Sequence, residues 1–366
     1  MEDTKESKES YESYKLNRRR KNREAGNIFV TIVICLIALA SLTGCIFLIL
    51  EDQQLKNDAG EFIAVMGPIE DGVFGNQEDS VRNEPGDLRL ADEVLDELRE
   101  RVSAGEDMSA ILRALFVDDI VVGADGRFHF FPINRSLKMH EYEPERFVME
   151  NGILSYTDED GYIISQKGID VSRYQTEIDW ERVAADGVDF AIIRVGFRGS
   201  TEGGLILDTY YEENIEGALA AGIDVGVYFF TQALNIEEAI EEAEFVLEHI
   251  AGFDITYPVV IDIEAINTTN PRTHNMTQSE WTDVAIAFCE RVKQAGYTPM
   301  IYGNLRSFMI MLDMERLEEY EKWFAFFRTP IYFPYAHSIW QYTEKGRVDG
   351  IEGDVDLNVG FKRSFN

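Results

Sequence analysis

Cysteine is scarce in this chain. Its 366 residues include three cysteines, of which Cys35 and Cys45 lie in one long apolar run and Cys289 lies at helical spacing among apolar residues. This number and spacing exclude a disulfide framework and fit neither a structural zinc site nor a thiol nucleophile. We therefore predict that Cys289 is a core residue. We also predict that the protein uses no cofactor.

Positive charge is also scarce. The chain has 34 Lys and Arg against 67 Asp and Glu, which gives a formal net charge of −33. A surface of this sign repels phosphate backbones, so nucleic acid is excluded as a partner. Hydrophobic residues make up 45% of the chain, which is enough for a sizeable core. The acidity therefore belongs to a solvated surface and not to global disorder.

Several catalytic signatures are missing as well. The sequence contains no GxSxG and no HExxH, the signatures of the α/β-hydrolase serine elbow and of a zinc protease. Residues 196–204 are rich in glycine but lack the GK[ST] ending of a phosphate-binding loop. We interpret that stretch as an ordinary loop.

One long apolar run is present, at residues 28–50. These 23 residues carry no charge, and as a helix they would span about 34 Å, enough to cross a bilayer. Residues 15–23 before the run hold six basic side chains, and Glu51 and Asp52 follow it. The positive-inside rule then predicts a single-pass (type II) cell membrane protein whose residues 1–27 are a basic cytoplasmic tail and whose remainder is extracellular.

Two alternatives concern the same segment. A cleavable signal peptide would have a shorter apolar region and a small-residue cleavage site. Residues 42–45, Leu-Thr-Gly-Cys, resemble the lipobox of bacterial lipoproteins, but apolar residues and not a polar tether follow them. Lipidation there would anchor the same domain on the same side. The missing disulfide pattern in the exported part fits a bacterial envelope.

Two segments separate this run from the C-terminal part. Residues 51–86 are polar and acidic without a period, which predicts a flexible tether. Residues 87–165 are predicted to be a small α+β stalk module. Apolar residues at helical spacing predict two helices in it, and Asp125-Gly126 between two strand-like runs predicts a hairpin. Basic residues beside aromatics in this module leave a ligand-binding role open.

From residue 166 onward, strand-like and helix-like segments alternate. The segments that predict strands are residues 168–175, 189–197, 224–232, 257–265, 298–304, 322–327, 338–343 and 353–360. Helices between the early strands end near a glycine, which suits a C-terminal cap. We predict an α/β fold, an irregular TIM-like (β/α) barrel whose last third is irregular because its helix signals are weak.

Carboxylates gather at the predicted C-terminal ends of these strands. Asp262 and Glu264 are two residues apart and project to the same face of one strand. Asp170 lies in the first strand and Asp356 in the last, and these two strands neighbour each other in a closed barrel. Like charges in a partly dry pocket raise a pKa, as a general acid at neutral pH requires. The cluster favours glycoside hydrolysis, while turn or N-cap roles and a cation site remain alternatives.

Aromatic residues occur at matching strand ends. Tyr228, Tyr302, Trp340 and Tyr342 are candidates for substrate contact, because aromatic platforms beside carboxylates suit a sugar chain. Arg194, in the segment FAIIRVG, is a further candidate for substrate binding. Core packing is the alternative for each aromatic residue, and for Tyr228 it is as well supported as substrate contact.

Taken in order, seven segments resemble glycoside hydrolase family 25, the Chalaropsis-type lysozymes: GIDVSRYQ, FAIIRVG, GVYFF, PVVIDIE, MIYGN, SIWQYT and VDGIEGDVDLN. The resemblance covers about residues 166–363. It implies an N-acetylmuramidase that cuts the β-1,4 bond between N-acetylmuramic acid and N-acetylglucosamine in peptidoglycan without a metal. It also implies that Glu264 is the general acid, that Asp262 stabilises developing positive charge, and that Asp170 and Asp356 complete an acidic floor.

Two departures from the family concern groove shape. Thr176 stands where many relatives have glycine, and residues 323–328 lack a tyrosine common near there. We predict residues 166–366 to be a catalytic barrel whose partners are peptidoglycan glycan strands. A peptidoglycan-binding or scaffold protein without turnover, a glycosidase of chitin-like specificity, and an interaction role centred on residues 87–165 are the alternatives.

Overall fold

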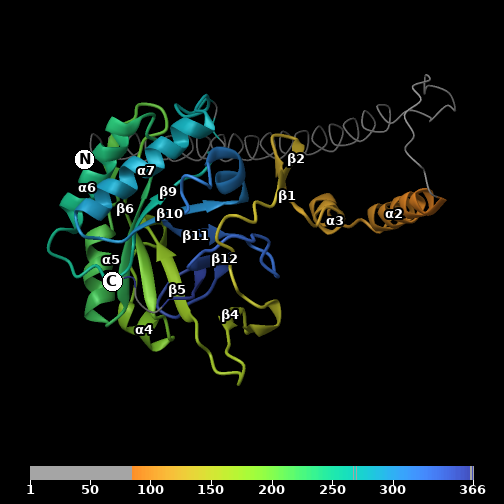
Figure 1. Ribbon diagram of the computed structural model, residues 1–366. Coiled ribbons are helices and arrows are strands. Elements are labelled where there is room, and N and C mark those ends of the chain that lie inside the picture. The colour runs from red at the N-terminus through yellow and green to blue at the C-terminus, as the bar shows by residue number, and fades with distance from the viewer. Residues whose placement is uncertain (1–84, 267, 269, 363–364, 366) are drawn as a thin grey trace, which may run out of the picture. The chain divides into compact units, whose positions relative to one another are not determined.

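The computed structural model describes residues 85–266, 268, 270–362 and 365 (Figure 1). The predicted cytoplasmic tail, the predicted membrane segment at residues 28–50 and the tether as far as residue 84 lie outside the described residues. Within the described part, no helix has both the length and the apolar character needed to cross a bilayer.

Eight strands close into a barrel. In chain order they are β5 Gln166–Val171, β6 Phe190–Arg198, β8 Asp224–Phe230, β9 Val259–Asp262, β10 Pro299–Asn304, β11 Glu321–Ala325, β12 Ile339–Gly346 and β13 Val355–Gly360. Their order around the sheet is β5-β13-β12-β11-β10-β9-β8-β6, and a further pairing of β5 with β6 closes it. The prediction of a closed eight-stranded barrel is therefore confirmed.

The barrel departs from a regular (β/α) pattern in its last third. Strand β13 runs antiparallel to both of its neighbours, whereas the other seven strands are parallel to one another. The short strand β7 Leu205–Leu207 pairs with β6 outside the closed ring. Between β10 and β11 the only described helix is a π-helical stretch, Ser307–Met311. The sequence carries weak helix signals in this region.

Four α-helices lie between the early strands: α4 Trp180–Ala185, α5 Tyr211–Ala220, α6 Ile236–Ile250 and α7 Gln278–Gln294. The start of α7 is a capping box in which Thr277 and Glu280 satisfy each other's backbone N–H groups. Gly296, just beyond its end, has φ +92°, a left-handed conformation that glycine adopts without a Cβ clash. Local capping therefore sets the bounds of this helix.

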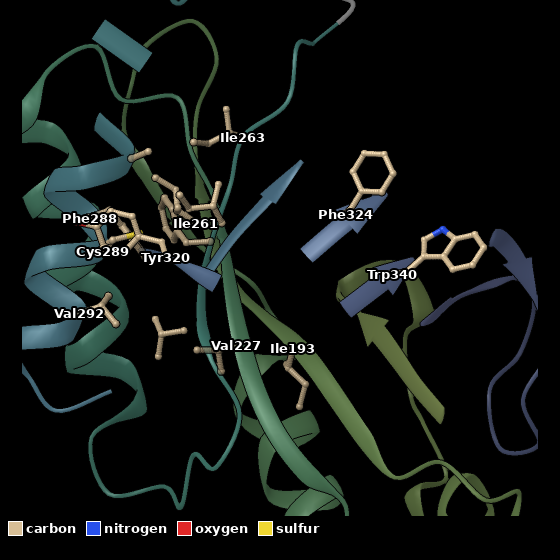
Figure 2. Packing of buried hydrophobic residues seen from close by; sticks show 14 of the residues in the cluster. Ile193, Val227, Ile261, Ile263, Phe288, Cys289, Val292, Tyr320, Phe324 and Trp340 are labelled. Atoms are coloured by element: carbon tan, nitrogen blue, oxygen red, sulfur yellow. The ribbon is translucent and has the colours of Figure 1, made fainter. Parts of the chain in front are cut away.

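Alternation along the strands separates two layers of apolar side chains. Ile193, Val227 and Ile261 belong to the main core cluster together with Phe288 and Cys289 of α7 (Figure 2). The alternate residues of the same strands form a second cluster inside the barrel. Cys289 is fully buried, and burial raises the pKa of its thiol. Its predicted place in the core is confirmed.

The described residues before the barrel form helices and two hairpins. They are α2 Pro85–Ser103, α3 Met108–Leu115, β1 Asp119–Ala124, β2 Arg127–Pro132, β3 Phe147–Glu150 and β4 Ile153–Tyr156, with a short 3-10 turn at Pro144–Arg146. A second 3-10 turn, Arg173–Gln175, follows β5 of the barrel. Strands β1 and β2 pair in register around Asp125 and Gly126, whose φ angles are +53° and +72°. The hairpin predicted at this dipeptide is confirmed.

This segment packs against the barrel. Ile120, Val122 and Leu154 belong to the same core cluster as the barrel helices. The backbone N–H of Val121 donates to the hydroxyl of Tyr332 at 2.9 Å. A separate stalk module at residues 87–165 stays a prediction, but its hairpins share apolar core with the barrel.

A buried ion pair fixes the loop after β6. Arg198 at the end of β6 donates from Nε to Glu242 of α6 at 2.7 Å and from Nη1 to the carbonyl of Gly203 at 2.7 Å. The side chains of Arg198 and Glu242 are 4% and 0% exposed. Burial raises the pKa of Glu242 to about 7, while the hydrogen bonds from its neighbours, including Arg198, lower it. The pair thus ties residues 199–204 to α6.

Replacing Arg198 with methionine leaves Glu242 buried without its cation, so we expect the free energy of unfolding to fall by about 3–5 kcal/mol. Adding Glu242→Met removes both charges, and we expect most of that loss to be recovered. Denaturant unfolding of the two variants and the unaltered protein at pH 7 measures the difference. An equal loss in the single and double variants would contradict this account of the pair.

Candidate active site

The C-terminal ends of the barrel strands surround a cleft. A cavity of about 480 Å³ there is lined by Asp170, Asp262, Glu264 and Asp356. A neighbouring cavity of about 230 Å³ is lined by the same four side chains and by Tyr302 among others. The structure therefore brings together all four carboxylates that the sequence singled out.

Strand pairing beyond the end of β9 orients two of these acids. The N–H of Thr231 donates to the carbonyl of Asp262 at 3.1 Å, and the N–H of Ile263 donates to the carbonyl of Tyr302 at 3.1 Å. The backbone therefore stays extended past Asp262. Because side chains alternate in an extended chain, Ile263 lies in the main core (Figure 2), and Asp262 and Glu264 both line the cleft.

The other two acids come from the first and last strands. Asp170 and Asp356 are directly opposite each other in the antiparallel pairing of β5 with β13. Oδ2 of Asp170 accepts a hydrogen bond from Nε2 of Gln341 at 2.9 Å and another from Nδ2 of Asn358 at 2.8 Å. Two amide donors thus hold this buried carboxylate in place.

Crowding and burial keep protons on this cluster. Burial, and then the charge of Asp170, raise the pKa of Glu264 to about 6. Burial, and then Glu264 and Asp170, hold the pKa of Asp262 well above its usual range. Burial and Asp170 raise the pKa of Asp356 to about 9. A carboxylic acid that remains partly protonated near neutral pH can donate a proton to a leaving group.

Three of the predicted contact residues line the cleft. Tyr228 and Arg194 line the larger cavity, and Tyr302 lines the smaller one. The hydroxyl of Tyr302 donates to Oε1 of Gln341 at 2.8 Å. The guanidinium of Arg194 forms an ion pair with Asp208, with Nη2 and Oδ2 2.7 Å apart.

Trp340 and Tyr342 do not line the cleft, so the prediction that both contact substrate there is wrong. Both belong to the main core cluster. Nε1 of Trp340 donates to the carbonyl of Phe326 at 2.8 Å, and the hydroxyl of Tyr342 accepts from the N–H of Leu154 at 3.2 Å. The physical reason is alternation along β12: Gln341, between them, points to the cleft, so its two neighbours point away.

Sequence reasoning missed a polar relay beneath the acids. Nε1 of Trp323 donates to Oδ1 of Asn358 at 2.8 Å, and Asn358 in turn donates to Asp170. Alternation of side chains along a strand could have predicted both amides. Asn358 lies two residues after Asp356, on the same face of its strand, and Gln341 lies between two aromatic residues, on the face opposite to theirs. The exposed ring of Tyr174, at the cleft rim, was also missed.

The described residues include no group of three or more His, Cys, Asp or Glu side chains arranged to hold a metal ion. Asp170 instead accepts hydrogen bonds from two amide donors. The prediction that the protein needs no cofactor stays a prediction.

A barrel with a carboxylate cluster at its C-terminal mouth is a framework for glycoside hydrolysis. Residues 169–351 match the family described as Glycosyl hydrolases family 25. The chain belongs to this family and is a glycoside hydrolase.

Curated relatives agree with this assignment. The uncharacterized protein YegX of Escherichia coli K12 is 30% identical over 195 residues, which cover 52% of this chain and 68% of that protein. Lysozyme M1 of Streptomyces globisporus is 28% identical over 203 residues, or 52% and 66% of the two chains. The autolytic lysozyme of Clostridium acetobutylicum is 27% identical over 192 residues, or 52% and 55%. The chain thus spans only part of each relative.

Among solved structures, the modular autolysin LytC of Streptococcus pneumoniae, in complex with a synthetic peptidoglycan ligand, superposes with a TM-score of 0.50 at 23% identity. The match covers 65% of this chain and 57% of that one. This likeness shows the fold.

The pH dependence of activity tests the environment of Glu264. Nδ2 of Asn304 lies 3.5 Å from Oε1 of Glu264 and lowers its pKa. In the Asn304→Asp variant Oδ1 still accepts from the N–H groups of Arg306 and Ser307, but a second carboxylate faces Glu264. We expect the alkaline fall in kcat/KM, set by loss of the Glu264 proton, to move to higher pH.

The measurement is the release of new reducing sugar ends across a pH series. Asn304→Ser, which removes the amide without adding charge, is the matched control and should shift the limb less. An alkaline limb that stays in place in Asn304→Asp would show that another group sets it.

Stability also reports on the cluster. The folded-state pKa of Asp262 lies above its unfolded value, so its contribution to stability declines as pH rises from about 4 toward the folded pKa. An asparagine side chain at this position does not titrate. We expect the free energy of unfolding of Asp262→Asn, relative to that of the unaltered protein, to rise by more than about 1 kcal/mol between pH 5 and pH 8. Denaturant unfolding of both proteins at the two pH values measures this difference. A pH-independent difference would contradict the shift.

Proposed function

We propose that this glycoside hydrolase is an N-acetylmuramidase that cleaves the β-1,4 bond between N-acetylmuramic acid and N-acetylglucosamine in peptidoglycan. The observation that carries the proposal is Glu264, with a pKa raised to about 6, beside Asp262 in a cleft at the barrel mouth. Sequence similarity to two proteins named as lysozymes supports the substrate class.

In the proposed mechanism, Glu264 protonates the oxygen of the scissile glycosidic bond. Asp262 stabilises the positive charge that develops on the sugar, by orienting the 2-acetamido group of the substrate as an internal nucleophile. Asp170 and Asp356 form the acidic floor, and the charge of Asp170 favours the protonated form of Glu264. Tyr228 and Tyr302 supply the aromatic walls against which a sugar ring packs.

The proposal includes where the enzyme works. The uncharged run at residues 28–50, with basic residues before it and acidic residues after it, supports a type II membrane protein. The N-terminus is then cytoplasmic and the barrel is displayed toward the wall on the outer face of a bacterial membrane. Susceptibility of the barrel to protease added to intact cells tests this orientation.

Removing the acid tests the mechanism. Glu264→Gln is nearly isosteric but cannot donate a proton, so we expect the rate on purified peptidoglycan to fall at least a hundredfold. The exposed Glu216→Gln change on α5 is the matched control and should retain the rate. The full-length protein is used, and the fragments that it releases from peptidoglycan are identified by mass spectrometry.

The products separate the alternatives. Reducing-end N-acetylmuramic acid from the unaltered protein is the expected result. Reducing-end N-acetylglucosamine, or preferential cleavage of chitin, would replace the muramidase with a glycosidase of another specificity. Binding of peptidoglycan without release of any product would favour a peptidoglycan-binding or scaffold protein without turnover. A Glu264→Gln protein that keeps more than about a tenth of the rate would remove Glu264 from its role.

A further inference from the structure

A third cavity, of about 380 Å³, lies on the other side of Glu264. It shares Glu264 alone with the 480 Å³ cavity and shares Glu264, Tyr302 and Phe327 with the smaller one. Glu264 therefore lies where the three cavities meet. Residues outside the family match form one wall of this third cavity: Arg113 of α3 and Val122 and Gly123 of β1.

Directional contacts hold this wall against the barrel. The hydroxyl of Tyr332 accepts from the N–H of Val121 at 2.9 Å and donates to the carbonyl of Asp119 at 3.0 Å. The guanidinium of Arg306 pairs with Asp125 in the hairpin turn, with Nη1 and Oδ1 2.9 Å apart. The wall is therefore tied to the same loop that follows Asn304.

Arg113 is the one charged side chain that the described residues of this wall place at the cavity, in a chain of net charge −33. Arg306 pairs with Asp125, and Arg328 pairs with Asp107 at 2.5 Å. Arg113 has no carboxylate within 4 Å among the described residues, and its guanidinium carbon lies 4.5 Å from the ring centroid of Tyr332. One buried donor of Arg306, Nε, also lacks a partner in the described part.

A half-buried guanidinium without a counter-ion is suited to an anionic ligand, because charge-assisted hydrogen bonds to a carboxylate are strong where water is partly excluded. The ring of Tyr332 packs against the guanidinium of Arg113 and leaves its remaining N–H groups for such a ligand. Its one hydrogen bond within the described chain runs from Nε to the carbonyl of Val121 at 3.3 Å.

We propose that residues 108–124 form a second wall of the substrate groove, and that Arg113 binds a carboxylate of the glycan strand next to Glu264. This inference rests on the proposed function, since the glycan strands of peptidoglycan carry carboxylates. The carboxylate has two sources: the lactyl group of a muramic acid without its peptide, or the peptide stem itself.

The test measures equilibrium binding of soluble glycan strands to the full-length Glu264→Gln protein, so that it does not depend on turnover. Three strands are compared: strands with peptide stems, strands stripped of peptide so that the lactyl carboxylate is free, and stripped strands whose carboxylates are amidated. Arg113→Met keeps the length and apolar packing of the side chain and removes its charge. Arg99→Met, at a side chain on α2 that is 73% exposed, is the matched control.

We expect Arg113→Met to weaken binding about tenfold more for a carboxylate-bearing strand than for the amidated strand. A selective loss on the peptide-bearing strands identifies the stem, and a selective loss on the stripped strands identifies the lactyl group. An equal change on all three strands, or no change on any, would overturn the proposal. Thermal unfolding of the variant, and a second variant Arg113→Lys, which keeps the charge and should recover part of the selectivity, separate ligand binding from folding.

Two outcomes distinguish the carboxylate subsite from the muramidase activity. If strands bind in a carboxylate-dependent way but the unaltered protein releases no product, the proposed muramidase activity is rejected and the proposed carboxylate subsite is kept. If muramic acid ends are released but Arg113→Met weakens binding equally on carboxylate-bearing and amidated strands, the proposed subsite is rejected and the proposed muramidase activity is kept.

Discussion

The burial of four mutually repelling carboxyl groups in one cleft is the constraint on which the site depends. Asp170 and Asp262 are buried and Glu264 and Asp356 are half-buried in one cleft, where four negative charges could not be held together. Burial, and then the charge of Asp170, therefore keep protons on the cluster and raise the pKa of Glu264 to about 6. Each acid becomes useful because the others are near it, so the site is a property of the group and not of one residue.

The barrel supplies what this arrangement requires. Extended backbone past the end of β9 keeps Asp262 and Glu264 on one side, and the antiparallel β13 places Asp356 opposite Asp170. Amide side chains from β12 and β13 then satisfy Asp170 with donors and no added charge. The departure of β13 from the parallel pattern is thus part of the site, because a reversed last strand brings its carboxylate into register with the first.

The sequence predicts those elements whose structure depends on neighbouring residues. Period-two alternation and capping residues predict the eight strands and the helices between the early ones, and Asp125-Gly126 predicts its hairpin. Trp340 and Tyr342 were misplaced because strand ends alone do not say which face of β12 turns inward. The wall around Arg113 could not be predicted, because only the tertiary packing of residues 108–124 brings it beside Glu264.

The most direct test of this account is a pH titration of the side-chain carboxyl carbons by NMR, with Asp and Glu labelled and Glu264 assigned through its Gln variant. The account predicts that Glu264 titrates near pH 6, and that a further carboxyl of the cluster is still protonated at neutral pH. Titration of all four groups near pH 4, the range of solvated carboxylates, would contradict it.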